Sequence, residues 1–363
     1  MITVMGRRVA GVLVLLAAAC AALLPGQAAW VERYYARGWY PVVQRGVTAA
    51  SNAVPFALID LLIVAAVVVG ALAAARVLRA PRGTRVRILA YRAWQGVVGG
   101  ALVYLAFLGT WGCNYQREPV SAWLDFDQSR VTTAAVRALN DRAITEMSAL
   151  RGRLPVAPGA WPSRGEFARS LLPALDEGVR LLHLPAPVRA GRPKTSILDL
   201  YFTRAGVSGM TDPLFLETLV ATNVLPFEQP MVIAHEWGHL AGLARESDAS
   251  FFGWVVCLRG RESAQYSAWL EVYLHTLPAL SRDERREVRQ RLPALVLADL
   301  EAMARRSERD QIRAVTLTAW RAYDRYLRAN RVGTGVRNYG EVVQLMVGTR
   351  FGPGWTPVVR SQD

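Results

Sequence analysis

The stretch Val232-Ile-Ala-His-Glu-Trp-Gly-His-Leu-Ala-Gly242 decides which kind of fold and site this chain can form. Positions i and i+4 of an α-helix share one face, so a helix here lets His235 and His239 present imidazole nitrogens to one metal ion. Glu236, one step round the helix, then lies beside the ion and can accept a proton from the water that the metal activates. This His-Glu-x-x-His spacing predicts a zinc site of the peptidase type.

Chance is a poor explanation of this motif, because the whole chain has four histidines. The neighbouring positions are uncharged, as expected of a buried helix that carries a metal site. The competing interpretation is a pair of core histidines that are satisfied by hydrogen bonds. We favour the metal site over this interpretation.

A third ligand is expected, because catalytic zinc usually takes three protein ligands and keeps a position for water. Glu246 follows His239 by seven residues, which on an unbroken helix would be about 10 Å along the axis. Gly242 offers a turn back, since glycine ends helices in the left-handed conformation at little cost. We favour Glu246 as the ligand; Asp248 is the competing ligand, or a support for one histidine ring. Either acid could also serve only to favour the first turn of the next helix.

The residues around this segment have the composition of a globular domain, which we place at residues 114–363 and which is large enough for one core. Strands are expected between residues 197 and 224, at Tyr201-Phe202 and over 215–220. Pro- and Gly-rich stretches at 154–165 and 185–193 are typical of loops. Ser281 and Glu284 form a capping-box pattern at one helix start. Helical periodicity covers residues 129–150, 166–182, 230–243, 247–258, 262–277, 282–306 and 310–330. We therefore expect an α-rich, α+β domain with a small sheet.

Three apolar segments precede this domain, at residues 9–29, 54–75 and 93–113. Each is about as long as the roughly 20 residues that cross a bilayer as a helix. We therefore expect a membrane region over residues 1–113 with three transmembrane helices. Asp60 is the one ionisable carboxylate in these segments and is expected at the outer membrane interface.

The first segment also has features of a signal peptide. Gln27-Ala28-Ala29 resembles a small-residue cleavage site, and Ala18-Ala19-Cys20 faintly resembles a lipobox. An uncleaved anchor is the interpretation we favour, because the apolar run is long. The topology of the remaining chain is the same in both cases.

Positive charge is concentrated around the apolar segments. Of the net charge of +14, the first 92 residues carry +9, from eleven arginines and two acids. A nucleic-acid binder is disfavoured, because its basic side chains would gather on the binding domain. The positive-inside rule places the N-terminus and the arginine-rich connector at residues 76–92 in the cytoplasm, and the domain after residue 113 outside. Aromatic residues expected in the outer interfacial belt are Trp30, Tyr34, Tyr35, Trp39, Tyr40 and Trp111.

Five stretches carry a resemblance to a known family. They are Tyr34-Tyr-Ala-Arg-Gly-Trp-Tyr-Pro-Val-Val-Gln-Arg45, Pro55-Phe-Ala-Leu-Ile-Asp-Leu-Leu62, Trp111-Gly-Cys-Asn-Tyr-Gln-Arg-Glu-Pro119, residues 235–251 and Tyr339-Gly-Glu-Val-Val-Gln-Leu345. Together they resemble a bacterial membrane-protein family, known as a domain of unknown function, in which three N-terminal transmembrane helices precede a zincin-like domain. The resemblance implies that fold and a metal site, but no substrate.

Around the metal helix the resemblance is close. Arg245-Glu246 and Ala249 match the family, whereas Ser250 stands where the family usually has Asn. Glu246 followed by Ala249 is also similar to the Glu-x-x-Ala of membrane-bound gluzincin peptidases, in which the Glu binds zinc. The exchange at Ser250 concerns a contact beside the ligands and not the ligands themselves.

These observations predict a membrane-anchored zinc endopeptidase in a bacterial cell membrane, with its domain on the extracytoplasmic side. His235, His239 and Glu246 are the expected zinc ligands and Glu236 the general base. Peptides or proteins, including membrane or envelope proteins, are the expected substrates, and a strand within residues 210–224 is expected to pair with their backbone.

The sequence gives weaker evidence for the roles of several other residues. The residue that donates to the oxyanion is left open among five candidates: Tyr266, Tyr273, His275, Arg337 and Tyr339. His275 is more simply a satisfied core histidine and Cys257 a small buried side chain. The alternative function is a non-proteolytic zinc-binding membrane sensor or envelope scaffold, although a structural zinc site would normally be closed by four Cys or His ligands.

Overall fold

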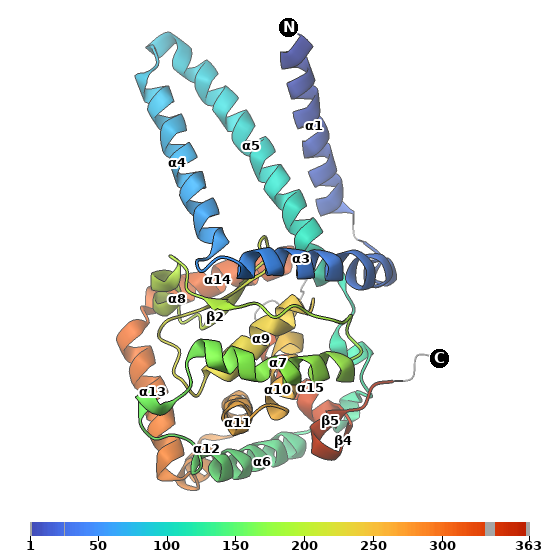
Figure 1. Cartoon of the computed structure of the whole chain (residues 1–363), viewed down its shortest axis with the longest axis vertical. Helices are drawn as coiled ribbons and strands as arrows, with labels where there is room; N and C mark the ends of the chain where they lie inside the picture. Colours follow the sequence, from blue (N-terminus) through green and yellow to red (C-terminus); the bar gives the residue numbers. More distant parts are fainter. Residues whose placement is uncertain (1, 25, 331–337, 361–363) are drawn as a thin grey trace.

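The computed structural model describes residues 2–24, 26–330 and 338–360, and it is mostly helical. Three long helices, α1 (Ile2–Leu23), α4 (Leu58–Arg79) and α5 (Arg85–Thr110), rise from one end of a helical body (Figure 1). The body holds the remaining helices and a small sheet. This arrangement agrees with the expected α-rich domain that follows apolar N-terminal segments.

Two of the three expected membrane helices are supported. The spans Leu58–Arg79 and Arg82–Thr110 are long and apolar enough to cross a bilayer, and both are exposed along their length. The first segment, expected at residues 9–29, does not form such a span alone. It qualifies only together with the helices of residues 28–52, from which it is bent by 114°. Pro25 and Gly26, which disfavour helix continuation, stand in the sequence at this bend.

Residues 28–52 lie across the body instead of continuing the direction of α1. They form α2 (Ala28–Trp30), η1 (Val31–Trp39) and α3 (Tyr40–Asn52). The interfacial belt predicted for this region is therefore wrong in part. Trp30, Tyr34 and Trp39 are exposed, but Tyr35, Tyr40 and Trp111 are buried in the core.

The burial of two of these aromatics has a clear cause. The Tyr40 hydroxyl donates to the Leu240 carbonyl oxygen (3.0 Å), and the Trp111 ring nitrogen donates to that of His239 (3.3 Å). These carbonyls belong to the last turn of a helix, where no amide four residues further on bonds to them; that of His239 also accepts from the Gly242 amide (2.8 Å). The core thus includes residues from both sides of the expected boundary at residue 113.

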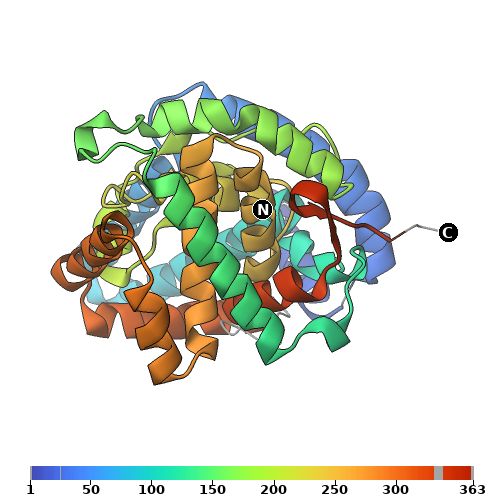
Figure 2. The same cartoon turned by 90° about the horizontal axis from the view of Figure 1, so that it is seen from below.

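The helices of the body follow the sequence-based predictions closely. They are α6 (Thr133–Arg151), α7 (Arg164–Leu181), α9 (Gln229–Leu240), α10 (Glu246–Leu258), α11 (Glu262–Thr276), α12 (Arg282–Gln290), α13 (Ala294–Asp310) and α14 (Arg313–Ala329). A further helix, α15 (Asn338–Gly348), was not predicted. The capping box of Ser281 and Glu284 is confirmed. The single helix predicted over 282–306 is wrong: it is divided into α12 and α13, because Pro293 cannot continue a hydrogen-bonded helix and caps α13 instead. Figure 2 shows α6 and α11 on the side of the body away from the long helices α1, α4 and α5.

The small sheet lies only partly where it was expected: two strands fall between residues 197 and 224, but a third, at Pro193–Lys194, lies before this range and begins in the stretch predicted as a loop. Strands β1 (Pro193–Lys194), β2 (Gly209–Asp212) and β3 (Glu217–Val220) have the order β1-β3-β2, with β1 parallel and β2 antiparallel to β3. Tyr201-Phe202, predicted as a strand, lies in α8 (Asp199–Ala205), which ends at Gly206 in the left-handed conformation (φ 75°). A second pair is formed by β4 (Phe351–Gly352) and β5 (Thr356–Pro357).

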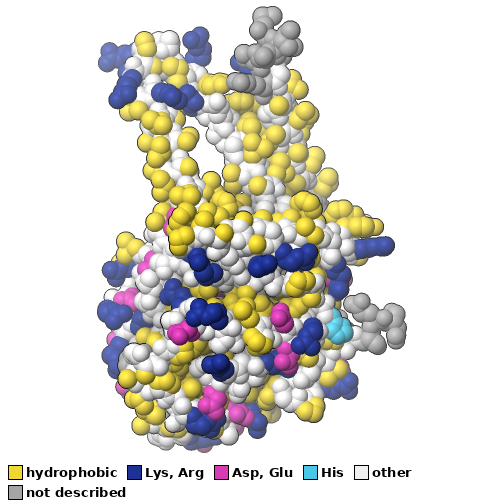
Figure 3. All heavy atoms as spheres, in the orientation of Figure 1, with side chains coloured by type: hydrophobic (Ala, Val, Ile, Leu, Met, Phe, Trp, Pro, Cys, Tyr) yellow, Lys and Arg dark blue, Asp and Glu magenta, His cyan; other side chains and the backbone are white. Residues whose placement is uncertain are grey.

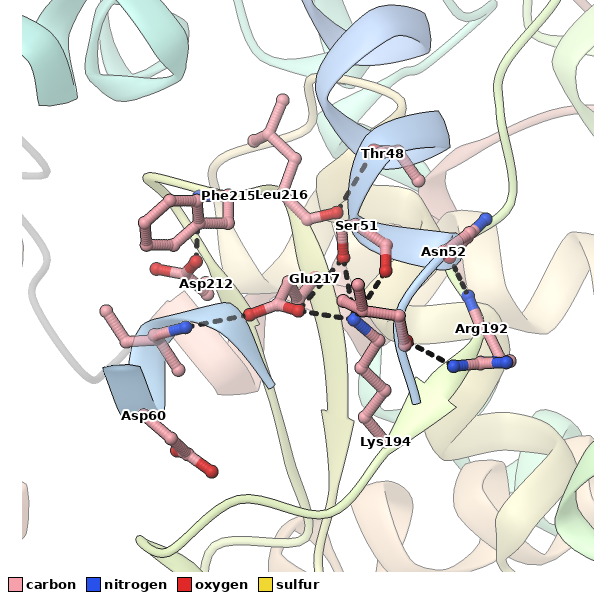
Figure 4. A network of polar contacts seen from close by, with 12 residues as sticks. Thr48, Ser51, Asn52, Asp60, Arg192, Lys194, Asp212, Phe215, Leu216 and Glu217 are labelled. Atoms are coloured by element: carbon pink, nitrogen blue, oxygen red, sulfur yellow. Dashed lines mark hydrogen bonds and ion pairs between the residues drawn. The ribbon is translucent and has the colours of Figure 1, made fainter. Parts of the chain in front are cut away.

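The corner between α3 and α4 is fastened to this sheet by a buried polar network (Figure 4). Lys194 Nζ donates to Glu217 Oε1 (2.6 Å) and to the Ser51 carbonyl oxygen (2.7 Å). Glu217 Oε2 accepts a hydrogen bond from the backbone of Ile59 in the first turn of α4 (3.1 Å). Asp60, next along that turn, accepts from Ser196 Oγ (2.5 Å) and from the amide of Ile197 (3.0 Å). The base of α4 therefore has a fixed position relative to β1 and β3.

Candidate metal centre

The helix α9 carries the His-Glu-x-x-His motif in the middle of the body. One turn separates His235 from His239, and their ring centroids lie 4.8 Å apart. Two glycines let α9 and α10 cross closely: a Cβ at Gly238 would lie 3.1 Å from Ala249 Cα, and one at Gly253 would lie 2.9 Å from the His235 amide nitrogen. This close crossing sets the side chains of α10 against the histidines.

A tight turn brings Glu246 back to the histidine face, as the sequence predicted. Gly242 adopts φ +86°, and the amide of Leu243 donates to the Gly238 carbonyl oxygen (3.1 Å), which closes the end of α9. Glu246 is the first residue of α10. Its Oε2 atom lies 3.2 Å from His235 Nε2 and 3.7 Å from His239 Nε2.

These three residues fit a metal ion by the chemistry and placement of their donor atoms. One ligand atom from each of His235, His239 and Glu246 lies within 4.8 Å of the others, and the described residues contain no second such cluster of His, Cys, Asp or Glu. Two imidazole nitrogens and one carboxylate oxygen are a ligand set of catalytic zinc, which leaves a position for water.

The Nδ1 atom of each histidine ring, which is not the nitrogen close to Glu246, contacts another polar group. His235 Nδ1 lies 3.1 Å from Ser250 Oγ, and His239 Nδ1 lies 2.7 Å from the Leu243 carbonyl oxygen. A carbonyl accepts only from a protonated nitrogen, so His239 Nε2 keeps its lone pair in the neutral ring. Such contacts orient ligands in metal sites. Ser250 thus occupies the ligand-supporting position that the sequence had marked.

Glu236 is held beside this cluster by β2. The Thr211 hydroxyl lies 2.9 Å from Glu236 Oε2 and 2.9 Å from its carbonyl oxygen. The backbone of Gly209 approaches from the same strand, where a Cβ would lie 2.6 Å from Glu236 Oε1. The carboxylate is therefore positioned by one hydroxyl and has little room to move.

Burial and mutual charge shift the protonation of the group. Burial raises the pKa of Glu236. Burial lowers the pKa of His239, but the carboxylates of Glu246 and Glu236 outweigh it and raise this pKa to about 9. Burial would raise the pKa of Glu246, yet the two histidines hold it well below its ordinary value. The negative charge of the glutamates and the protons on the histidines thus compensate one another, and a bound cation would replace those protons.

Asp248, the competing acid, does not join the cluster. Its Oδ2 accepts a hydrogen bond from the amide of Val120 (3.3 Å), and burial raises its pKa to about 7. The histidine nitrogens that it might have supported contact Ser250 and Leu243 instead. Of the two acids, Glu246 is the one that the structure brings to the histidines.

The oxyanion candidates fall in different places. The hydroxyl of Tyr266 donates to Asp299 (2.5 Å) in the core, and Tyr273 is also buried. His275 Nε2 lies 2.9 Å from Glu271 Oε1, and both residues line the cavity that contains the motif. Arg337 lies outside the described residues, as does the side chain of Tyr339. Cys257 is fully buried, and burial raises its pKa.

That cavity has a volume of about 570 Å³ and mainly apolar walls. The motif residues and Glu246 lie at one side of it, and β2 borders it through Gly209, Met210 and Thr211. Within the three-stranded sheet β2 is an outer strand, paired on one side by β3. An outer strand can accept an added extended peptide.

Tyr323 is a contact that sequence reasoning missed. It comes from α14, lines the cavity, and donates its hydroxyl to Glu246 Oε1. Residues 310–330 were expected to be helical, but helical periodicity carries no signal of which distant residue a helix contacts. Thr211 and Glu271 were missed for the same reason.

Comparison with known proteins places the chain in a family but does not name an activity. No curated protein and no solved structure matches it. The profile of the family described as "Protein of unknown function (DUF3810)" matches residues 35–347, which include α4, α5, the His-Glu-x-x-His motif and α14. The chain therefore belongs to the DUF3810 family.

Proposed function

We propose that this protein is a membrane-anchored zinc endopeptidase with a zincin-like domain. The observation that carries the proposal is the joint placement of His235, His239 and Glu246, with the buried Glu236 beside them, in a cavity bordered by an outer strand. A closed structural zinc site would be expected to have four Cys or His ligands. The present set is open toward a cavity, which favours catalysis.

The residues of the site would have different roles in peptide hydrolysis. His235, His239 and Glu246 would hold zinc, which supplies a polarised carbonyl and an acidified water when bound. The Glu236 carboxylate, oriented by Thr211, would accept the proton of the attacking water and pass it to the leaving amine nitrogen. Strand β2 would hold the substrate backbone in extended form. Of the described oxyanion candidates, His275 lines the cavity and is oriented by Glu271.

The membrane topology is part of the proposal. Arg76, Arg79, Arg82, Arg85 and Arg87 cluster at the turn between α4 and α5. Figure 3 shows basic side chains at that end of the helical pair and hydrophobic ones along its length. The positive-inside rule then places this turn in the cytoplasm and the cavity on the extracytoplasmic side of a bacterial cell membrane.

The test uses the full chain in lipid nanodiscs, because residues before 113 contribute to the core. Bound zinc is measured first, and cleavage of a peptide library is then compared between the wild type and Glu236→Gln. We expect one zinc per chain in both proteins, with cleavage lost in the variant and in the chelator-treated wild type. Zinc without Glu236-dependent cleavage would support a sensor or scaffold instead. Absence of stoichiometric zinc would contradict both zinc functions.

A further inference from the structure

Three helices of the body lie at the base of the transmembrane pair: α3, α8 and α14 (Figure 1). The helix α3 leads directly into α4, and the preceding Trp39 donates its ring N–H to the Gly109 carbonyl oxygen near the end of α5 (2.9 Å). One side of α3 is buried, through Gln44 and Thr48. The other side exposes Val42, Gly46 and Ala50, which carry no charge.

The helix α8 lies beside the base of α4. The amide of Ile197, just before α8, donates to Asp60 in the first turn of α4 (3.0 Å). Ile197 and Leu200 are nevertheless 57% and 68% exposed. Large aliphatic side chains so exposed, next to a membrane-spanning helix, have lipid as their natural neighbour.

The helix α14 runs from α8 to the base of α5. At one end the amide of Ile312 donates to the Arg204 carbonyl oxygen at the end of α8 (3.0 Å). At the other end the ring of Tyr326 lies 6.4 Å from that of Phe107 in α5. Between these contacts, Leu317 and Trp320 are 46% and 41% exposed.

The exposed side of α14 combines apolar and basic groups. Four exposed arginines, Arg313, Arg321, Arg325 and Arg328, stand against one acid, Asp324. Exposed Leu and Trp side chains flanked by arginines are typical of helices that lie in a membrane interface and contact anionic lipid. We propose that α3, α8 and α14 form a membrane-docking face, defined here by these three helices, that rests on an anionic phospholipid bilayer.

The cavity opens at this docking face. Tyr201 of α8 and Trp320 of α14 line the cavity, and both are also more than 40% exposed. Tyr323, one turn after Trp320, reaches Glu246 from the same helix. A single helix, α14, therefore connects the proposed lipid surface, at Trp320, with the proposed metal ligand Glu246, which Tyr323 contacts.

This arrangement specifies a substrate class for the proposed peptidase, and this part of the inference rests on the proposed function. A cavity with its mouth at the lipid surface and mainly apolar walls favours a polypeptide held at the bilayer over one in free solution. The substrate is an extended segment close to the point where a membrane-bound polypeptide leaves the bilayer.

The docking face has a test that does not depend on activity. In a chain with Cys20 and Cys113 changed to Ser and the buried Cys257 retained, cysteines introduced one at a time at Leu200 and Leu317 are labelled with an environment-sensitive fluorophore. Leu172→Cys on α7, an exposed leucine on a helix that is not part of the face, is the matched control. In anionic nanodiscs we expect nitroxide-labelled lipid to quench the first two labels about twofold or more relative to the control. Equal quenching at all three positions would overturn the docking face.

The substrate class is tested with one peptide in two forms, free and acylated for membrane anchoring, in the same anionic vesicles. We expect cleavage of the anchored form to be about tenfold faster, because anchoring raises its effective concentration at the cavity mouth. Leu200→Glu with Leu317→Glu should reduce this preference and leave cleavage of the free peptide unchanged, whereas Leu172→Glu should alter neither. Equal cleavage of both forms would contradict the substrate class alone, and cleavage of neither would contradict the peptidase while the docking result stands.

Discussion

Ser250 lies behind the ring of His235, with its Oγ 3.1 Å from Nδ1, while Nε2 of the same ring lies 3.2 Å from Glu246 Oε2. The His235 ring thus lies between the hydroxyl of Ser250 on α10 and the carboxylate of Glu246, the proposed ligand at the start of the same helix. Because the ring cannot turn without losing the first contact, the second nitrogen would be presented to a bound ion in a fixed direction.

Removal of this support should weaken metal binding. We expect Ser250→Ala to reduce zinc affinity by about 10-fold or more, as loss of such ligand-orienting contacts does in metal sites. Ser250→Asn keeps a hydrogen-bonding side chain and should retain affinity near that of the wild type. Competition with a chromophoric chelator measures both. Identical affinities of Ser250→Ala and wild type would show that Ser250 does not orient the ring.

The turn at Gly242 should tolerate no side chain. Its φ of +86° is costly for other residues, and a Cβ there would lie 2.6 Å from Arg117 Nη1. We expect Gly242→Ala to destabilise the fold by about 1–3 kcal/mol and to lower zinc content, since the turn sets the position of Glu246.

Gly152→Ala is the control for this change, because its added Cβ meets nothing within 4 Å and its φ is −64°. It should leave both the melting temperature and the zinc content unchanged. The role of the turn would be refuted by Gly242→Ala protein that melts and binds zinc like the wild type.

The sequence predicted those features that depend on neighbours along the chain. The helix that carries the His-Glu-x-x-His motif, the turn at Gly242 and the capping box at Ser281 each follow from spacing and local conformational preference, and each is present. Local preference was misleading at Tyr201-Phe202, where β-favouring aromatics lie in a short helix closed by Gly206.

Features that depend on distant contacts were beyond such reasoning. Tyr40 and Trp111 were assigned to the lipid interface, because aromatic residues next to apolar segments usually lie there. The structure places both against carbonyls at the end of α9. Likewise Tyr323 reaches Glu246 across 77 positions of sequence. Nothing in a helical pattern identifies such a partner.

The stability of the protein should depend on pH through Asp212. Burial raises the pKa of this carboxyl to about 6, compared with about 3.9 in an unfolded chain. The native state therefore holds a proton that the unfolded state has lost between about pH 4 and pH 6, so stability falls as pH rises through this window. Above it the ionised, buried carboxylate costs up to about 3 kcal/mol.

Asp212→Asn should remove this ionisation cost at the expense of one hydrogen bond, because the amides of Leu214 and Phe215 donate to different oxygens of Asp212 and an asparagine has only one. We therefore expect the melting temperature of the variant, relative to that of the wild type, to be higher at pH 8 than near pH 4. Melting curves in detergent across this range measure the difference. A difference that does not change with pH would rule out ionisation of Asp212 as its cause.

The ion pair of Lys194 and Glu217 should be the main fastening between the sheet and α4. Both side chains are at most 1% exposed, and Glu217 also accepts from Ser51 Oγ and the Ile59 amide. Lys194→Met leaves a buried carboxylate without its cation, which typically costs about 3–5 kcal/mol. Adding Glu217→Gln removes the unpaired charge and should recover much of the loss.

Arg291→Met is the control. It breaks a pair of similar length (2.6 Å) that is about half exposed and should cost less than about 1 kcal/mol. Thermal unfolding compares the three variants, and limited proteolysis between residues 52 and 58 reports on the corner itself. If Lys194→Met were no more harmful than Arg291→Met, the network would not be what fixes the membrane helix to the sheet beside the candidate site.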